Sequence, residues 1–168
     1  MATRHETRCS VNTLYLCGAG NVEGVRLALL VDRVGRRWER IVLLDDDVTK
    51  HGSDRLGVPI IGGFARLSDA DPMTDEVVDL VTRTTAGRAA AREKIAACRI
   101  PFASLIHPDV ELFGARIHDE VTIYAHASIG AESTLESSCV VLTGAVVGHG
   151  THMGRGCVIA PTRSSTRG

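Results

Sequence analysis

The clearest indication of the fold is the segment RIHDEVTIYAHASIGAESTLESSCVVLTGAVVGHGTHMGRGCVI, residues 116–159. Every sixth residue in it is aliphatic or methionine: Ile117, Ile123, Ile129, Leu135, Val141, Val147, Met153 and Ile159. Four residues after each of these, except the last, stands a small or β-branched residue: Val121, Ala127, Ser133, Cys139, Ala145, Thr151 and Cys157. A period of six that combines a large apolar residue with a small one is typical of hexapeptide-repeat parallel β-helices.

Such a helix is a triangular prism in which three hexads make one coil of about 18 residues. The large residue of each hexad fills the interior, and the small one lets the chain turn without crowding it. Residues one coil apart then stack on each other. The repeat therefore predicts three columns: Ile117 with Leu135 and Met153, Ile123 with Val141 and Ile159, and Ile129 with Val147.

The N-terminal half, residues 12–105, follows a different pattern, in which short apolar runs alternate with helical segments. We expect strands at 12–17, 40–44, 57–61 and 76–81, helices at 22–31 and 86–98, and a last extended piece at 102–106. Strands that alternate with helices indicate parallel βαβ units. The predicted fold class is α/β: a small parallel-sheet, Rossmann-like domain over 12–105, a left-handed parallel β-helix over 106–161, and a polar, disordered tail at 162–168.

Composition limits the function classes. The 168 residues carry a net charge of −1, with basic and acidic residues balanced along the chain, which argues against a nucleic-acid partner. The N-terminus is polar, and no apolar run approaches the roughly 18 residues that a membrane span needs. The five cysteines form no CxxC pair, which argues against a disulfide framework. We expect a cytoplasmic protein without a membrane segment.

Short motifs add to this pattern in a fixed order. They are GAGN at 18–21, LDDD at 44–47, GVPIIG at 57–62, LIHP at 105–108 and then the repeat itself. In order and spacing, residues 12–161 resemble the sugar acyltransferases typified by bacterial PglD and NeuD. The resemblance implies acetyl transfer from acetyl-CoA to an amino or hydroxyl group of a sugar, often a nucleotide-linked one. It also implies a homotrimer with active sites between neighbouring β-helices.

The first motif predicts part of a substrate site. Gly18 and Gly20 end a strand and precede a helix, so that backbone N–H groups can face a phosphate, and Asn21 can cap that helix. The spacing to Gly24 is one residue longer than in the dinucleotide fingerprint, so NAD is not expected. The alternative is that the glycines only permit a tight turn.

The second motif places Asp45 and Asp46 at the carboxyl end of a strand, where open α/β sheets bind ligands. A carboxylate there accepts hydrogen bonds from a ribose or a base, and the resemblance implies a nucleotide near this point. A solvated strand end is the alternative. The predicted substrate-binding residues are Gly18, Gly20, Asn21, Asp45 and Asp46.

By resemblance, His149 aligns with the catalytic base of the family. A sugar ammonium or hydroxyl group must lose its proton before it attacks a thioester, and histidine exchanges protons near neutral pH. The acidic residue that follows this histidine in the family is Gly150 here. A glutamate from a neighbouring coil or subunit, Glu132 or Glu136, is an alternative acidic partner for His149. Gly150 also has a structural interpretation, because glycine fits a corner of the coil that needs a positive φ.

Three further residues are candidates for an acyl-donor groove across the trimer: His126, Gly148 and His152. The alternative for His152 is an exposed repeat residue without chemistry. The histidine set is also similar to that of trimeric β-helix enzymes that bind zinc between subunits. Hexad corners do not place residues i and i+3 side by side, however, so we expect no metal.

Two functions therefore remain open. The first is an acetyl-CoA-dependent N- or O-acetyltransferase with His149 as general base. The second is a non-catalytic relative that binds a nucleotide or sugar, or a structural subunit of an acyltransferase assembly. The retained His149 favours the first, whereas Gly150 and a regular repeat that extends only to Pro161 favour the second.

Overall fold

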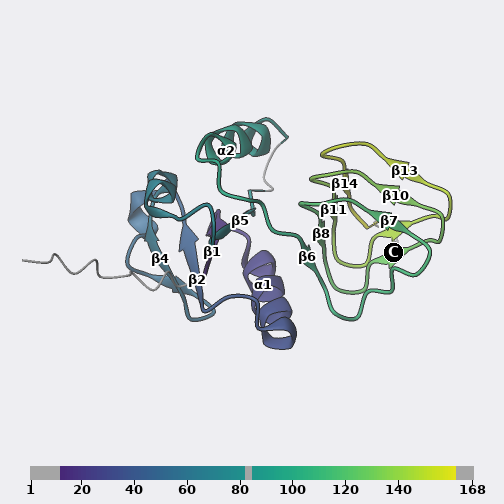
Figure 1. The fold of residues 1–168 in the computed structure, drawn as a ribbon, viewed down its shortest axis with the longest axis horizontal. Helices are drawn as coiled ribbons and strands as arrows, with labels where there is room; N and C mark the ends of the chain where they lie inside the picture. Colours follow the sequence, from purple (N-terminus) through teal and green to yellow (C-terminus); the bar gives the residue numbers. More distant parts are fainter. Residues whose placement is uncertain (1–11, 82–84, 162–168) are drawn as a thin grey trace, which may run out of the picture.

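The computed structural model describes residues 12–81 and 85–161. It has two parts, a sheet with helices on both faces and a coil of short strands (Figure 1). We call them the sheet domain (β1–β5, α1 and α2) and the coil domain (β6–β14). The predicted polar tail, 162–168, lies outside the described residues.

The sheet domain contains five strands in the order β3-β4-β2-β1-β5. All neighbours are parallel except β3 and β4. The strands are β1 (Thr13–Cys17), β2 (Arg40–Leu44), β3 (Asp54–Arg55), β4 (Val58–Gly62) and β5 (Glu76–Asp79). The helices are α1 (Val22–Gly35), α2 (Thr85–Ala97) and the short 3-10 helices η1 (Val48–Lys50) and η2 (Phe64–Asp69).

Alternating side chains of β1 divide the sheet domain into two cores. Leu14 and Leu16 pack on the α1 side, whereas Tyr15 and Cys17 pack on the side of α2 and η2. A strand that is buried on both faces reads as a continuous apolar run, as residues 13–17 do. The predicted α/β class with a parallel sheet is confirmed.

The coil domain consists of nine two-residue strands. They are β6 (Leu105–Ile106), β7 (Arg116–Ile117), β8 (Thr122–Ile123), β9 (Ser128–Ile129), β10 (Thr134–Leu135), β11 (Val140–Val141), β12 (Val146–Val147), β13 (His152–Met153) and β14 (Val158–Ile159). They form three parallel sheets, β13-β10-β7, β14-β11-β8-β6 and β12-β9. Their registers pair Leu135 with Ile117 and Met153, and Val141 with Ile123 and Ile159, which confirms the predicted stacking.

The first coil differs from the others by one residue. Thr122 pairs with Val140 of the next coil but with Leu105 of the preceding one, so the first coil is one residue shorter. Leu105 and Ile106 thus join the coil domain, while Phe102 forms a bridge with Val77 of the sheet domain. The predicted boundary between 105 and 106 falls inside this connection.

The coil turns at a residue of positive φ in every hexad. These residues are Gly114, Glu120, His126, Glu132, Ser138, Gly144, Gly150 and Gly156, with φ between 60° and 79°. The corner predicted at Gly150 is confirmed by its φ of 64°. Non-glycine residues at such corners cost roughly 1 kcal/mol each, which the stacking of the coils offsets.

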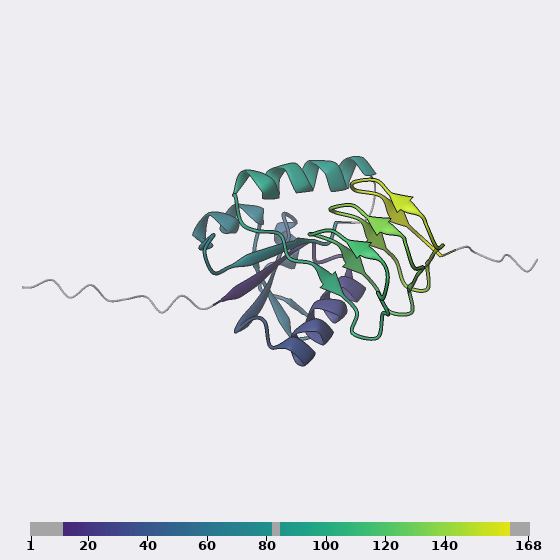
Figure 2. The ribbon, with the colours of Figure 1, turned by 45° about the vertical axis from the view of Figure 1, so that its right-hand side comes forward.

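The two domains contact each other along two lines. Tyr124, which follows β8 in the second coil, packs into the core on the α1 side of the sheet. Arg88 of α2 donates hydrogen bonds to the corner carbonyls of Ser138 and Gly156, and α2 runs beside the later coils (Figure 2). Within residues 12–81 and 85–161, no helix combines the length and apolarity needed to cross a membrane.

Candidate functional site

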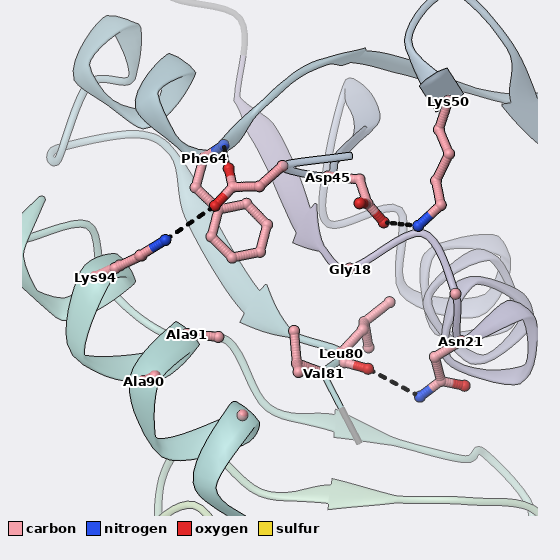
Figure 3. A pocket seen from close by; sticks show the side chains of 13 residues that line it. Gly18, Asn21, Asp45, Lys50, Phe64, Leu80, Val81, Ala90, Ala91 and Lys94 are labelled. Carbon is pink, nitrogen blue, oxygen red and sulfur yellow. Dashed lines mark hydrogen bonds and ion pairs between the residues drawn. The ribbon is translucent and has the colours of Figure 1, made fainter. Parts of the chain in front are cut away.

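A pocket of about 370 Å³ opens at the carboxyl edge of β1, β2 and β5, between the start of α1 and the flank of α2 (Figure 3). We call it the edge pocket. All five predicted substrate-binding residues line it: Gly18, Gly20, Asn21, Asp45 and Asp46. The fold therefore brings together two motifs that are separated by more than twenty residues in the chain.

The two glycines of the turn have different roles. Gly18 has a φ of 111°, and a Cβ there would lie 3.1 Å from Val81 Cγ2 and 3.3 Å from the Val81 nitrogen. The turn at Gly18 thus requires glycine for its own geometry. A Cβ at Gly20 would meet no atom within 4 Å, so the absent side chain leaves the pocket open instead.

Asn21 caps α1, as the sequence predicts. Its Oδ1 accepts a hydrogen bond of 2.9 Å from the Gly24 N–H. Its Nδ2 donates to Leu80 O at 3.3 Å and to the Tyr124 hydroxyl at 2.9 Å. The side-chain amide of Asn21 thus makes hydrogen bonds within the protein, and it links the pocket wall to the coil domain.

Asp45 is held by three donors. Its carboxylate accepts hydrogen bonds from the Ala19 N–H (2.9 Å), the Asp47 N–H (3.0 Å) and Lys50 Nζ (2.9 Å). Burial raises the pKa of Asp45, but the bonds from Lys50 and the two N–H groups outweigh it, so the pKa lies below its usual value. With a side chain only 13% exposed, Asp45 is not a solvated strand end.

Asp46 lines the same pocket and has different hydrogen-bond donors. It accepts hydrogen bonds from the Phe64 N–H at 2.8 Å and from Lys94 Nζ at 3.1 Å. The Phe64 N–H is the main cause of the lowered pKa of Asp46; burial opposes it, and Lys94 adds to it. Both carboxylates are therefore ionised at neutral pH, and each faces a lysine.

The sequence reasoning missed Lys50 and Lys94. Lys50 belongs to η1 and stands five residues after Asp45. This short spacing in the sequence could have indicated the contact between the two side chains. Lys94 reaches Asp46 from α2, on the opposite wall (Figure 3). No local pattern indicates that contact, because it depends on how α2 packs over the sheet. Together with the N–H groups at the start of α1, these ammonium groups suit a ligand that carries phosphates.

His149 is exposed at a corner of the coil domain, between β12 and β13. Its backbone packs on Gly130: a Cβ on that glycine would lie 2.7 Å from His149 Cα and from the Gly148 carbonyl carbon. The Gly150 N–H donates to Ala131 O at 3.0 Å. The imidazole makes no hydrogen bond or ion pair with any residue that the structure describes.

The two candidate carboxylates lie in different places. Glu136 stands between two other histidines, with Oε2 at 3.8 Å from His118 Nδ1 and Oε1 at 3.8 Å from His152 Nε2. Glu132 occupies the same corner as Gly150, one coil earlier, with a φ of 62°. Glu136 therefore lies beside His118 and His152, and Glu132 lies one coil before Gly150, the residue that follows His149.

The remaining groove candidates are not brought together within one chain. His126 is exposed at a different corner, in register with Gly144, and Gly148 is exposed beside His149. His152 is 65% exposed. Among residues 12–81 and 85–161, no group of three His, Cys, Asp or Glu side chains is arranged to hold a metal ion.

The fold is similar to two acetyltransferases of known structure. The acetyltransferase domain of PglB from Neisseria gonorrhoeae FA1090, in complex with acetyl coenzyme A, is 30% identical over 88% of this chain and 67% of that chain, with a TM-score of 0.68. PerB from Caulobacter crescentus, in complex with CoA and GDP-perosamine, is 21% identical over 87% of this chain and 67% of that chain, with a TM-score of 0.67. No protein-family model and no curated protein matches the sequence.

At 21% identity, the likeness to PerB concerns the fold alone. The likeness to the PglB domain supports a family relationship as well as a shared fold, because it combines 30% identity with coverage of most of this chain and two thirds of the other. It also agrees with the motif order of residues 12–161 and with the register of the coils. The chain is an acyltransferase and belongs to the family of sugar acyltransferases typified by PglD and NeuD.

Proposed function

We propose that the protein transfers an acetyl group from acetyl-CoA to an amino or hydroxyl group of a sugar that is linked to a nucleotide. The observation that carries this proposal is the edge pocket, in which a glycine turn, two carboxylates and two lysines converge. The likeness to the PglB domain in complex with acetyl coenzyme A supports the choice of donor.

The edge pocket suits the nucleotide part of such a substrate. Lys50 and Lys94 provide positive charge on opposite walls, and the start of α1 adds its backbone N–H groups, so a diphosphate is favoured between them. Asp45 and Asp46 present carboxylate oxygens that accept hydrogen bonds from ribose hydroxyls or base N–H groups. The sugar then extends out of the pocket towards the reacting groups.

His149 acts as the general base. Its imidazole accepts the proton that the sugar amine or hydroxyl loses while it attacks the thioester carbonyl carbon, and then donates this proton to the departing sulfur. The tight packing on Gly130 fixes the backbone of His149, which lowers the entropic cost of placing the base. We assign the supporting carboxylate to Glu132, since it stands at the same corner one coil earlier.

We place the acyl donor in a groove lined by His126, Gly148 and His152. Because His126 and His149 lie at different corners of one coil domain, this groove needs the coil domains of two neighbouring subunits. A homotrimer with left-handed coils provides such an arrangement at each of its interfaces. We expect the protein to act in the cytoplasm, on small-molecule substrates and without nucleic acid or a resident metal ion.

The test is an acetyl-transfer assay with acetyl-CoA and a panel of UDP- and GDP-linked amino sugars and their hydroxyl counterparts. CoA release is followed with a thiol reagent, and the product by its gain in mass. We expect transfer to at least one nucleotide-linked sugar and none to the free nucleoside diphosphates. Binding of these sugars without any transfer would contradict the proposal and favour a non-catalytic relative.

A further inference from the structure

A second pocket, of about 270 Å³, lies between α2 and the coil domain and shares no lining residue with the edge pocket. Its walls are Arg88, Ala89 and Arg92 from α2, and Ser138, Arg155 and Gly156 from two successive coils. We call it the arginine pocket, because its three charged residues are all arginines and come from both domains.

Two of these arginines are fixed in position by the fold. Arg88 donates from Nη1 to Gly156 O at 3.1 Å and from Nη2 to Ser138 O at 2.6 Å. Arg92 pairs with the carboxylate of Glu120, and its guanidinium carbon lies 4.1 Å above the centre of the Phe102 ring. Guanidinium groups that are held in this way lose little further entropy when they bind a ligand.

The pocket carries more positive than negative charge. Glu120 is the one acidic side chain paired directly with its arginines in the described part of the chain, and it also accepts a hydrogen bond of 2.9 Å from Ser138 Oγ. Arg155 is exposed and has no ion pair or hydrogen bond within residues 12–81 and 85–161.

Two pKa shifts reflect the charges around this pocket. Burial lowers the pKa of Arg92; Glu120 and Asp79 oppose that effect, and the nearby charges of Arg88 and Arg155 add to it. Burial raises the pKa of Asp79, the other acidic group near these arginines, and the Val81 N–H and the charges of Arg88 and Arg92 oppose that rise. The three cations are thus close enough to repel each other, and an anion between them would relieve the repulsion.

The remaining donors suit an oxyanion. A guanidinium has five N–H groups, of which Arg88 uses two for the corner carbonyls, and Arg155 adds a third guanidinium at the pocket wall. Several N–H groups at fixed positions match the oxygens of a phosphate or sulfate group, and such charge-assisted bonds are stronger than neutral ones.

We propose that the arginine pocket binds a phosphate group, held by Arg155 together with the free donors of Arg88 and Arg92. The bound anion connects α2 to the coil domain. The same helix carries Lys94 and forms one wall of the edge pocket. The phosphate group is either free inorganic phosphate or part of a larger ligand such as CoA.

The test is calorimetric titration of the full chain with inorganic phosphate, at constant ionic strength set with chloride. Arg155→Gln removes one cation at an exposed position, so the fold is retained. The matched control is Arg33→Gln, which removes the same charge from an exposed site on α1. We expect the dissociation constant for phosphate to rise about fivefold in Arg155→Gln, in line with the loss of a charge-assisted bond at a hydrated site, and to stay unchanged in the control.

Competition identifies the source of the phosphate group. If CoA displaces phosphate and CoA without its 3′-phosphate does not, the pocket holds that group of the acyl donor. If neither displaces it, the pocket holds the free anion; both results support the site. Absence of phosphate binding at millimolar concentrations, or equal affinity in Arg155→Gln and wild type, would overturn the proposal whether or not the protein transfers acetyl groups.

Discussion

The coil domain and the sheet domain bring residues together in different ways. In the coil domain the neighbours of Leu135 are the residues one coil before and after it, Ile117 and Met153. In the sheet domain Asp46 meets Lys94, which lies 48 residues away on another element. Contacts of the first kind follow from a repeat in the sequence, and contacts of the second kind depend on the whole fold.

The same difference separates the proposed roles of the two domains. The coil domain offers rigid, repeated positions, which suit a base such as His149 that must be held in place. The sheet domain offers a pocket whose walls come from several elements, which suits recognition of a large substrate. The predictions below test how far the two domains respond differently to comparable changes.

The largest expected effect is on the stacking of coils. In Gly130→Ala the new methyl group would lie 2.7 Å from backbone atoms of Gly148 and His149. These backbone atoms cannot move aside as the end of a flexible side chain can. We expect a loss of about 3 kcal/mol in the free energy of unfolding, at the upper end of overpacking effects. Urea denaturation measures it.

The control for Gly130 is Gly154→Ala, another glycine of the coil domain, where an added Cβ meets no atom within 4 Å. Its unfolding free energy should stay within about 0.5 kcal/mol of the wild type, as for most surface substitutions. Equal losses in both variants would show that tight stacking at Gly130 is not what the coil requires.

A comparable change in the sheet domain should cost less. In Gly24→Ala the new methyl group would lie 2.6 Å from Leu80 Cδ2, the end of a flexible side chain that can shift. Overpacking of about 2 kcal/mol is partly offset by the helix propensity of alanine, worth about 1 kcal/mol over glycine. We expect a net loss of about 1 kcal/mol by urea denaturation; a loss as large as that of Gly130→Ala would contradict the comparison.

One hydroxyl group contributes a hydrogen bond to the junction between the domains. Tyr124→Phe removes the hydrogen bond to Asn21 Nδ2, which still donates to Leu80 O. We expect a loss of roughly 0.5–1 kcal/mol, the usual contribution of one such bond, by thermal or urea denaturation. The control is Tyr15→Phe, since the hydroxyl of Tyr15 has no hydrogen bond to a described residue, and this variant should remain close to wild type.

The smallest expected effect concerns acid stability. The folded-state pKa of Asp45 lies below its value in the unfolded chain, about 3.9. Its ionised form therefore adds stability above about pH 4, and this contribution is lost as the pH falls from there through the lowered folded-state pKa. We expect Asp45→Asn to be less stable near neutral pH and to lose less further stability on acidification, measured by urea denaturation from about pH 7 to about pH 2.5. Glu39→Gln, at an exposed carboxylate, should leave the curve unchanged.

The repeat and the apolar runs predicted most of the fold. The stacked columns of the coil and the corner at Gly150 follow from a period of six, and the strand at 40–44 matches its observed bounds. The antiparallel β3, η1 and η2 were not predicted, because they are too short for a periodic pattern. Helix α1 continues to Gly35, beyond the predicted end at Val31, and ends at Arg36 in the left-handed conformation.

The candidate site was predictable where short motifs directly follow parallel strands. Gly18, Gly20, Asp45 and Asp46 line one pocket because parallel strands end at one edge of the sheet. The contacts of Asn21 with Tyr124 and of Asp46 with Lys94 join elements that no local pattern connects. The proposed acidic partner of His149 has the same limit, since the register gives the corner at Glu132 but one chain does not contain the proposed groove between subunits.

In the proposed mechanism the sheet domain binds the nucleotide-linked sugar and the coil domain carries out acetyl transfer. The most direct test measures both properties in His149→Ala: the dissociation constant of the sugar substrate by calorimetry, and the rate of acetyl transfer by CoA release. We predict that transfer falls at least about a hundredfold, as expected for loss of a general base, while the dissociation constant stays within about twofold. An unchanged rate, or a loss of binding that accounts for the lost rate, would contradict the account.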